Sequence, residues 1–469
     1  MATDYITPGV YVEEISRSPL MVTEVETAIP AFTGYTQNDT NNETSLLNKP
    51  TRINSLREYE SIFGMPQPVT LTININADNT LVGEVVVPSI AFRLYYALQL
   101  YFANGGGRCY ITCVANYAAA GATSVSRYTQ MKAGLDAVRK TDEPTILLFP
   151  DAPSLNEVQF YRLYRDALKQ CAALRDRVTV IDVYTASGTD SFASIADRFR
   201  KGVGDKFLSY GAAYYPYLRA AITPFINEAT HAVTGGSLAA GSFLRLPDNA
   251  ADLSKSIYHN NSKLYSAIKK SLQKNNIILP PGSAVAAIYC QVDNTRGVWK
   301  APANVSLNGV IEPMVRINSM DQEDMNATPT GKSVNAIRLF EGKGLLVWGA
   351  RTLAGNDNDW RYISVRRFCN MVEESVKKAC NSFVFEPNDA NTWIKVRGMT
   401  ENFLLLKWRA GALMGSKPEQ AFFVHVGLGQ TMTAQDIAEG RMIVTIGLAV
   451  IRPAEFIILR FSQKMLKSY

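Results

Sequence analysis

The chain is 469 residues long, with 47% hydrophobic and 19% charged residues, so it can bury a large core and is predicted to divide into two or three domains. This composition excludes collagen, a coiled coil and wholesale disorder. The sequence contains no charge-free run of about 18 apolar residues, and its first residues, MATDYITPGV, lack the basic-then-apolar order of a secretory signal. We therefore expect a protein that folds in the cytosol without inserting into a membrane.

The net charge of +6 comes from 48 basic and 42 acidic residues and is concentrated towards the C-terminus. Residues 361–409 contain nine Lys or Arg against five Asp or Glu, and residues 451–469 contain four against one. This local excess favours an acidic partner for the C-terminal part of the chain.

The first 36 residues are predicted to form an extended arm followed by strands. Pro8, Pro19 and Pro30 recur every eleven residues and exclude a long helix, while short β-prone segments lie between them. A polar loop, QNDTNNETSLLNKP, follows at residues 37–50.

From residue 51 to residue 218, helical and strand patterns alternate. Ser55 and Glu58 resemble a capping box before a short helix that ends by Gly64, and residues 70–87 alternate apolar and polar as a hairpin would. The other predicted elements are a helix at 90–104, strands at 109–114 and 145–150, a helix at 154–174, a strand at 178–184, a helix at 190–201 and a strand at 212–218. Strands that are apolar throughout and alternate with helices predict a covered, largely parallel sheet, and hence an α/β fold.

The rest of the chain is less uniform. Residues 219–275 are interpreted as an insertion, and residues 286–345 are expected to contain loops around GVWKAPAN. The predicted C-terminal elements are a helix at 361–383, a second helix starting after Pro387, a helix at 400–415, a strand at 421–427, a short helix between Thr433 and Gly440, and two β segments at 442–451 and 455–464.

The sequence offers little support for catalysis or for a bound cofactor. The six cysteines are scattered without a CxxC pair, and the three histidines lie far apart, which disfavours a metal site or a disulfide framework. Thr330-Gly331-Lys332-Ser333 resembles the end of a phosphate-binding loop, but Asn326 occupies the position of its first glycine. No GxSxG elbow occurs, so we expect no catalytic residues, no cofactor and no metal.

The predicted helix at 361–383 carries a basic cluster. Glu373 is spaced to pair with Lys377, and Glu374 with Lys378. The helix has two interpretations. It is either an ordinary solvated face, or a docking face from which Arg366, Arg367, Lys377 and Lys378 project together towards an acidic surface.

Several segments, in order along the chain, resemble the contractile tail sheath proteins, and most closely the sheaths of extracellular, phage-tail-like contractile injection systems. They are TPGVYVEEI at 7–15, VETAIPAFTGYT at 25–36, YFANGGGRCYI at 101–111, VWGARTL at 347–353, WRYISVRR at 360–367, FEPND at 385–389, WRAGALMG at 408–415 and RPAEFIILRF at 452–461. The resemblance is weakest at 67–87 and 219–275.

This resemblance implies a structural, non-enzymatic subunit that forms stacked hexameric rings around an inner tube. Such a sheath contracts and drives the tube through a target envelope. The implied partners are further copies of the chain, the inner tube protein, and baseplate and terminal cap proteins, without nucleic acid. The particle would be assembled in the bacterial cytoplasm and released. A static shell or baseplate protein and an unrecognised α/β enzyme remain as alternatives.

The resemblance also implies a domain plan and two sets of functional residues. It gives an N-terminal arm at 1–24, an outer α/β domain at 25–345 that contains the insertion, an inner tube-facing α+β domain at 346–453, and a C-terminal arm at 454–469. The arms would add strands to neighbouring subunits, and the receiving sheet would include 421–427 and 442–450. The implied arm residues are Val10, Tyr11, Val12, Ile15, Phe456, Ile457, Ile458, Leu459 and Phe461. The tube-docking candidates are Arg366, Arg367, Lys377, Lys378, Lys407 and Arg409.

Overall fold

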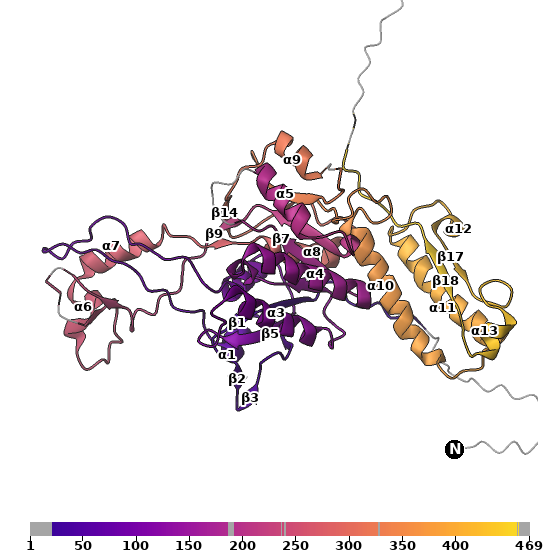
Figure 1. Ribbon diagram of the computed structural model, residues 1–469, viewed down its shortest axis with the longest axis horizontal. Helices are drawn as coiled ribbons and strands as arrows, with labels where there is room; N and C mark the ends of the chain where they lie inside the picture. Colours follow the sequence, from indigo (N-terminus) through magenta and orange to yellow (C-terminus); the bar gives the residue numbers. More distant parts are fainter. Residues whose placement is uncertain are drawn as a thin grey trace, which may run out of the picture. The chain divides into compact units, whose positions relative to one another are not determined.

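The computed structural model describes residues 21–185, 192–235, 237–238, 241–326, 329–456 and 458 (Figure 1). They divide into two compact units. The larger unit comprises Glu26–Glu373 and the described residues from Ile451 onward, and the smaller comprises Glu374–Val450 and the described residues up to Val25. The main boundary therefore falls inside helix α10 (Ile363–Cys380), whereas the boundary expected from the family resemblance lies after residue 345.

The larger unit is built on a nine-stranded mixed sheet. In sheet order its strands are β13 (Val305–Ser306), β16 (Gly344–Trp348), β15 (Val334–Phe340), β8 (Gly211–Tyr215), β7 (Val178–Asp182), β6 (Ile146–Leu148), β1 (Pro30–Thr36), β5 (Cys109–Asn116) and β4 (Thr51–Ile53). The six strands from β15 to β5 pair in parallel, and the antiparallel pairs lie at the two edges. The predicted α/β fold with a largely parallel sheet is confirmed.

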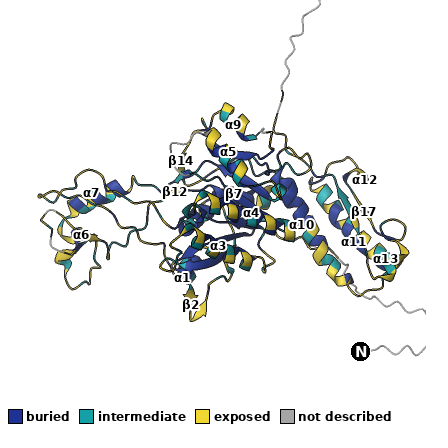
Figure 2. Cartoon of the chain, in the orientation of Figure 1, coloured by how far each residue is buried: buried dark blue, intermediate teal, exposed yellow. Residues whose placement is uncertain are grey.

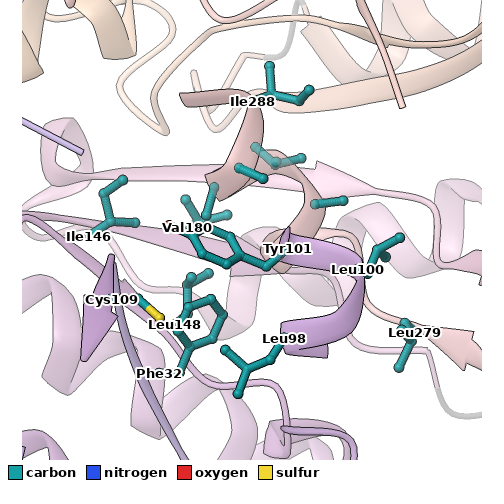
Figure 3. Packing of buried hydrophobic residues seen from close by; sticks show 14 of the residues in the cluster. Phe32, Leu98, Leu100, Tyr101, Cys109, Ile146, Leu148, Val180, Leu279 and Ile288 are labelled. Carbon is teal, nitrogen blue, oxygen red and sulfur yellow. The ribbon is translucent and has the colours of Figure 1, made fainter. Parts of the chain in front are cut away.

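Helices cover both faces of this sheet because its strands are apolar on both sides. Ile146 and Leu148 of β6 belong to one hydrophobic cluster, whereas Leu147 between them belongs to another. The first cluster contains helices α2 (Leu94–Ala103) and α8 (Gly282–Arg296), and Figure 3 shows Phe32, Tyr101 and Val180 meeting within it. The second contains α3 (Ser124–Val138), α4 (Glu157–Leu174) and α5 (Phe192–Gly202). In Figure 2, α4 has a buried side and an exposed side, as its amphipathic sequence requires.

Most predicted elements of this unit are present. Ser55 caps α1 (Leu56–Phe63) and accepts a hydrogen bond from the Glu58 amide, as the capping pattern predicts. The predicted strand at 212–218 is instead two strands in different sheets, because Pro216 has no amide hydrogen to continue a ladder. After it, β9 (Leu218–Ala220) pairs with β12 (Ile278–Leu279) and β14 (Val310–Pro313).

The expected loop around GVWKAPAN is present at residues 297–304, between α8 and β13, but the rest of the stretch 286–345 contains helices and strands that were not predicted. Helix α8 extends to Arg296 and is buried along most of its length, so its apolar residues show no amphipathic period. Helix α9 (Ser319–Asn326) and strands β15 and β16 follow, and these two strands complete one side of the main sheet.

A separate hydrophobic cluster, here called the satellite lobe, joins residues 70–87 to residues 226–272. Leu71 and Val85 from the first segment pack with residues of α6 (Ile257–Asn260) and α7 (Ser262–Leu272) from the second. The hairpin predicted at 70–87 is present as two isolated antiparallel bridges, Thr72 with Val86 and Ile75 with Leu81. The two stretches with the weakest family resemblance therefore form one structural body. A short strand pair, β10 (Ala232–Val233) with β11 (Ser242–Phe243), also belongs to it.

The smaller unit combines helices with a two-stranded sheet. Helix α11 (Ala390–Arg409) begins after Pro387 as predicted, but it is continuous through Gly398 to Arg409, so the prediction of a separate helix at 400–415 is wrong. Gly398 is accommodated in the helix interior. Strand β17 (Phe422–His425) follows α12 (Pro418–Ala421) and pairs antiparallel with β18 (Thr445–Leu448). Between these strands, Thr433 and Asp436 form the predicted capping box of α13 (Ala434–Ala438).

Candidate functional site

The carboxyl edge of a parallel sheet is where α/β proteins usually bind ligands, and here two buried aspartates occupy it. Asp151, just after β6, accepts hydrogen bonds from the amides of Tyr35 (2.9 Å) and Leu94 (3.1 Å), at the start of α2. Asp182, at the end of β7, accepts one from the amide of Gly282 (2.8 Å), at the start of α8. The chain's own carboxylates thus cap both helix N-termini.

Burial controls the protonation of both aspartates. Removal from water raises the pKa of Asp151, although hydrogen bonds from the Tyr35 and Arg93 amides oppose the shift. Burial likewise raises the pKa of Asp182 to about 7, against the hydrogen bonds from the Gly282 amide and the Tyr164 hydroxyl. These carboxyl groups are engaged in holding α2 and α8 to the sheet.

The other chemical motifs are also used internally. Lys332 of the TGKS segment donates to the Arg200 carbonyl (2.7 Å) and pairs with Asp205 (2.6 Å). His259 contacts Ser256 (2.7 Å) and Asp248 (3.2 Å), the three residue types of a catalytic triad. The Ser256 hydroxyl is fully buried, however, and accepts a hydrogen bond from the Leu246 amide (3.1 Å), so it is not exposed to a substrate. Within the described ranges, no group of three or more His, Cys, Asp or Glu side chains is placed to hold a metal ion. None of the helices described is long and apolar enough to cross a membrane.

The two-stranded sheet of the smaller unit is the candidate assembly site. Its strands lie within the segments 421–427 and 442–450, and Val424 is directly opposite Ile446. Leu413 bridges Val450 just beyond β18, while among the described residues no third strand pairs with β17. A strand with an open edge presents unpaired amide and carbonyl groups to another extended segment.

The N-terminal arm residues Val10, Tyr11, Val12 and Ile15 lie outside the described residues, but the segment that follows them is anchored. Val22 packs against a small cluster that contains Phe383 of the smaller unit. The Val25 amide donates to the Ser375 hydroxyl (3.0 Å), and Glu24 forms an ion pair with Lys407 of α11.

The C-terminal arm begins at a partly buried ion pair in the larger unit. The Arg351 guanidinium contacts both carboxylate oxygens of Glu455, at 3.0 Å and 3.1 Å from Nε and 2.5 Å from Nη2. Phe456 and Ile458 follow with side chains 75% and 78% exposed. The predicted arm residues Ile457, Leu459 and Phe461 lie outside the described part of the chain. Arg351 could not be predicted as an anchor, because it lies 104 residues from Glu455 and no sequence pattern relates the two.

The structure does not bring the basic candidates together as one projecting cluster. Arg366 is buried, stacks 3.9 Å from the Trp360 ring centroid and pairs with Glu373 (3.0 Å). Arg367 is buried against Asp293 (2.5 Å) and also donates to the Thr27 carbonyl (2.9 Å).

The remaining four candidates belong to the smaller unit. Lys377 and Lys378 are exposed, and both lie near Glu374, at 3.0 Å and 3.6 Å. The predicted Glu373–Lys377 pair is absent because Glu373 binds Arg366 instead. Arg409 is exposed at the end of α11, whereas Lys407 is directed to Glu24.

The larger unit thus has a covered parallel sheet whose edge carboxylates are engaged internally, and the smaller unit has a two-stranded sheet with an open edge among the described residues, features that suit a structural subunit. Residues 355–464 match the family described as the phage tail sheath C-terminal domain. The tail sheath protein of Enterobacteria phage T4 is 24% identical over 152 residues, which span 31% of this chain and 23% of the T4 protein.

Solved structures match the chain over nearly its whole length, among them two contracted sheaths. The helical sheath of the anti-feeding prophage (AFP) in its contracted state is 31% identical, covers 98% of this chain and 100% of its own, and has a TM-score of 0.66. The contracted sheath complex of PVC, an extracellular contractile injection system, is 29% identical, covers 99% of both chains and has a TM-score of 0.66. The chain therefore belongs to the contractile sheath proteins of phage tails and phage-tail-like injection systems, and the resemblance seen in the sequence is confirmed.

Proposed function

We propose that this sheath subunit polymerises as stacked hexameric rings around an inner tube, and that contraction of the polymer drives the tube through a target envelope. The similarity of nearly the whole chain to the AFP helical sheath supports this proposal most strongly. Tube, baseplate and cap proteins would complete the particle, which acts without catalysis. The energy of contraction would come from better-matched contacts between subunits in the contracted state.

Subunits would be linked by strand addition. The N-terminal segment, with Val10–Ile15, and the C-terminal segment, with Phe456–Phe461, would extend the β17–β18 sheet of neighbouring copies. Main-chain hydrogen bonds of this kind keep subunits tethered while they rotate, provided that the linking residues bend. The anchors at Val25 and at Glu455 would fix where each arm leaves its own subunit.

Deletion of residues 1–20 tests the tethering. We expect the shortened chain to keep the melting temperature of the unassembled full-length subunit, because Val22, Glu24 and Val25 still anchor the residues that remain. Each ring would lose many equivalent links at once, so long sheaths should disappear cooperatively in electron micrographs. Long sheaths of the shortened chain, or a large fall in its monomer stability, would contradict exchange of this arm.

Tube docking is assigned to the exposed basic residues of the smaller unit. We expect Lys377→Glu with Lys378→Glu to leave the subunit folded and to weaken assembly on the tube. If the contact that remains is electrostatic, assembly of the variant should weaken further at high salt, because salt screens that contact. The matched control is Lys201→Glu, which changes an exposed, ion-paired lysine of α5 in the larger unit. Co-sedimentation of sheath with tube measures the effect. Normal tube-templated assembly of the double variant would move docking to the end of α11, where Arg409 is exposed.

A further inference from the structure

The loop between α10 and α11 exposes a large aromatic side chain. Phe385 is 103% exposed, and Val384 before it is 59% exposed. The backbone of Phe385 has φ of +72°, in the left-handed region that bulky residues rarely adopt. Phe385 therefore combines two energetic costs: an apolar ring that is exposed to water, and a backbone conformation that is unfavourable for a bulky residue.

The subunit itself holds this loop in place. The Val384 amide donates to the Asn381 carbonyl (3.3 Å), and the Glu386 amide donates to the Phe383 carbonyl (3.1 Å). Phe383 is buried in the small cluster of this unit, so the chain turns outward directly after an anchored residue. Asp389 then caps α11 by accepting from the Thr392 amide (3.0 Å). Glycine or asparagine would serve this turn better, which indicates that the aromatic ring has a use outside the subunit.

We propose that Phe385, supported by Val384, is an anchor that becomes buried against a second copy of this chain in the assembled sheath. The inference rests on the proposed function, because only a polymer places a second copy beside every subunit. An exposed aromatic ring on a loop held by backbone hydrogen bonds is the kind of residue that dominates the binding energy of an interface.

Charge favours a second copy over the inner tube as the partner. Glu386 and Asp389, which flank the anchor, are exposed acidic residues. The basic excess of this part of the chain favours an acidic tube, and an acidic tube would repel them. The C-terminal segment 451–469 of another copy, with four basic residues against one acidic residue and several apolar ones, complements them.

Two substitutions separate a role in assembly from a role in folding. Phe385→Gly and Phe385→Asn both suit the left-handed backbone, so we expect the melting temperature of the unassembled subunit to stay equal or to rise. The same variants should raise the protein concentration needed for sheath formation at least tenfold, as measured by sedimentation and electron microscopy. The matched control, Val158→Ala, removes a 68% exposed apolar side chain from α4 and should assemble like the wild type.

A photo-crosslinker at this position identifies the partner. The full-length chain with Phe385→p-benzoylphenylalanine should give sheath-to-sheath adducts in assembled particles and none in dilute monomer. Adducts to the tube protein alone would overturn the inference, as would wild-type assembly by both the Gly and the Asn variants. Wild-type chains that never form sheaths would refute the proposed function, and the inference with it, whereas failure of the inference alone leaves wild-type sheaths intact.

Discussion

Asp182 is the residue at which folding and protonation are most directly coupled. Its pKa in the folded chain, about 7, lies above the ordinary value of 3.8, so the folded state binds this proton more tightly than the unfolded state. The free energy of unfolding therefore falls as pH rises from about 4 to about 7. The stabilisation that comes from the protonated Asp182 carboxyl is fully present only below this range. At 1.36 kcal/mol per pKa unit, the change is on the order of 4 kcal/mol.

Asp182→Asn tests this coupling. The amide oxygen can still accept from the Gly282 amide, but the group no longer titrates. We expect the fall in unfolding free energy between pH 4 and pH 7 to be several-fold smaller in this variant than in the wild type, measured by urea denaturation of the monomer. Asp142→Asn, at an exposed position, should retain the wild-type slope. Equal slopes in all three proteins would show that Asp182 is ionised throughout.

At the scale of elements, the Arg351–Glu455 pair holds the start of the C-terminal arm to the larger unit. Glu455→Gln weakens that hold and leaves the buried Arg351 with less compensation, although Arg351 still donates to the Asn326 carbonyl (2.9 Å). We expect cleavage of the native monomer by chymotrypsin at Phe456 to become about tenfold faster. The melting temperature should fall by a few degrees.

The matched control is Arg452→Gln, which breaks the neighbouring Arg452–Asp359 pair (3.2 Å). Both partners of that pair are exposed, so its loss should change neither measurement. Faster cleavage in the Arg452→Gln variant but not in the Glu455→Gln variant would show that the Arg452–Asp359 pair, and not the Arg351–Glu455 pair, holds the start of the arm.

The satellite lobe also belongs to this scale. Deleting residues 226–274 alone would expose Leu71 and Val85 from the other segment, so we expect that variant to aggregate. Replacing residues 70–87 as well as 226–274 with short Gly-Ser linkers removes the lobe as a unit. The doubly shortened chain should stay soluble and still form sheaths that contract. Loss of ring stacking in this variant, seen by electron microscopy, would make the lobe an intersubunit contact.

The sequence predicted those elements whose signals are local. The caps at Ser55 and Thr433 and the apolar strands of the main sheet follow from short patterns, and the structure contains them. Helix α8 escaped prediction because a buried helix has no polar face, and β15 and β16 because residues far apart in the chain complete their burial.

The candidate site was predictable only in part, for the same reason. The strand pair of the smaller unit lies where the family resemblance implied it. However, the burial of Arg366 and Arg367 depends on Trp360, Asp293 and Thr27, and the last two lie far away in the sequence. The outward ring of Phe385 depends on a backbone angle that no sequence pattern encodes.

At the scale of the whole molecule, the chain passes between its two units three times, after Val25, after Glu373 and after Val450. This path fixes the order in which the parts are completed during synthesis. The main sheet of the larger unit has all its strands once Trp348 has been added, whereas β18 is finished only at Leu448. Chains leave the ribosome N-terminus first, so the larger unit can fold while the strand pair that would receive a neighbour does not yet exist. Under the proposed strand addition, a nascent subunit cannot receive a neighbour's arm at this sheet before Leu448 has been translated, so chains growing side by side on one messenger RNA would be kept from polymerising too early.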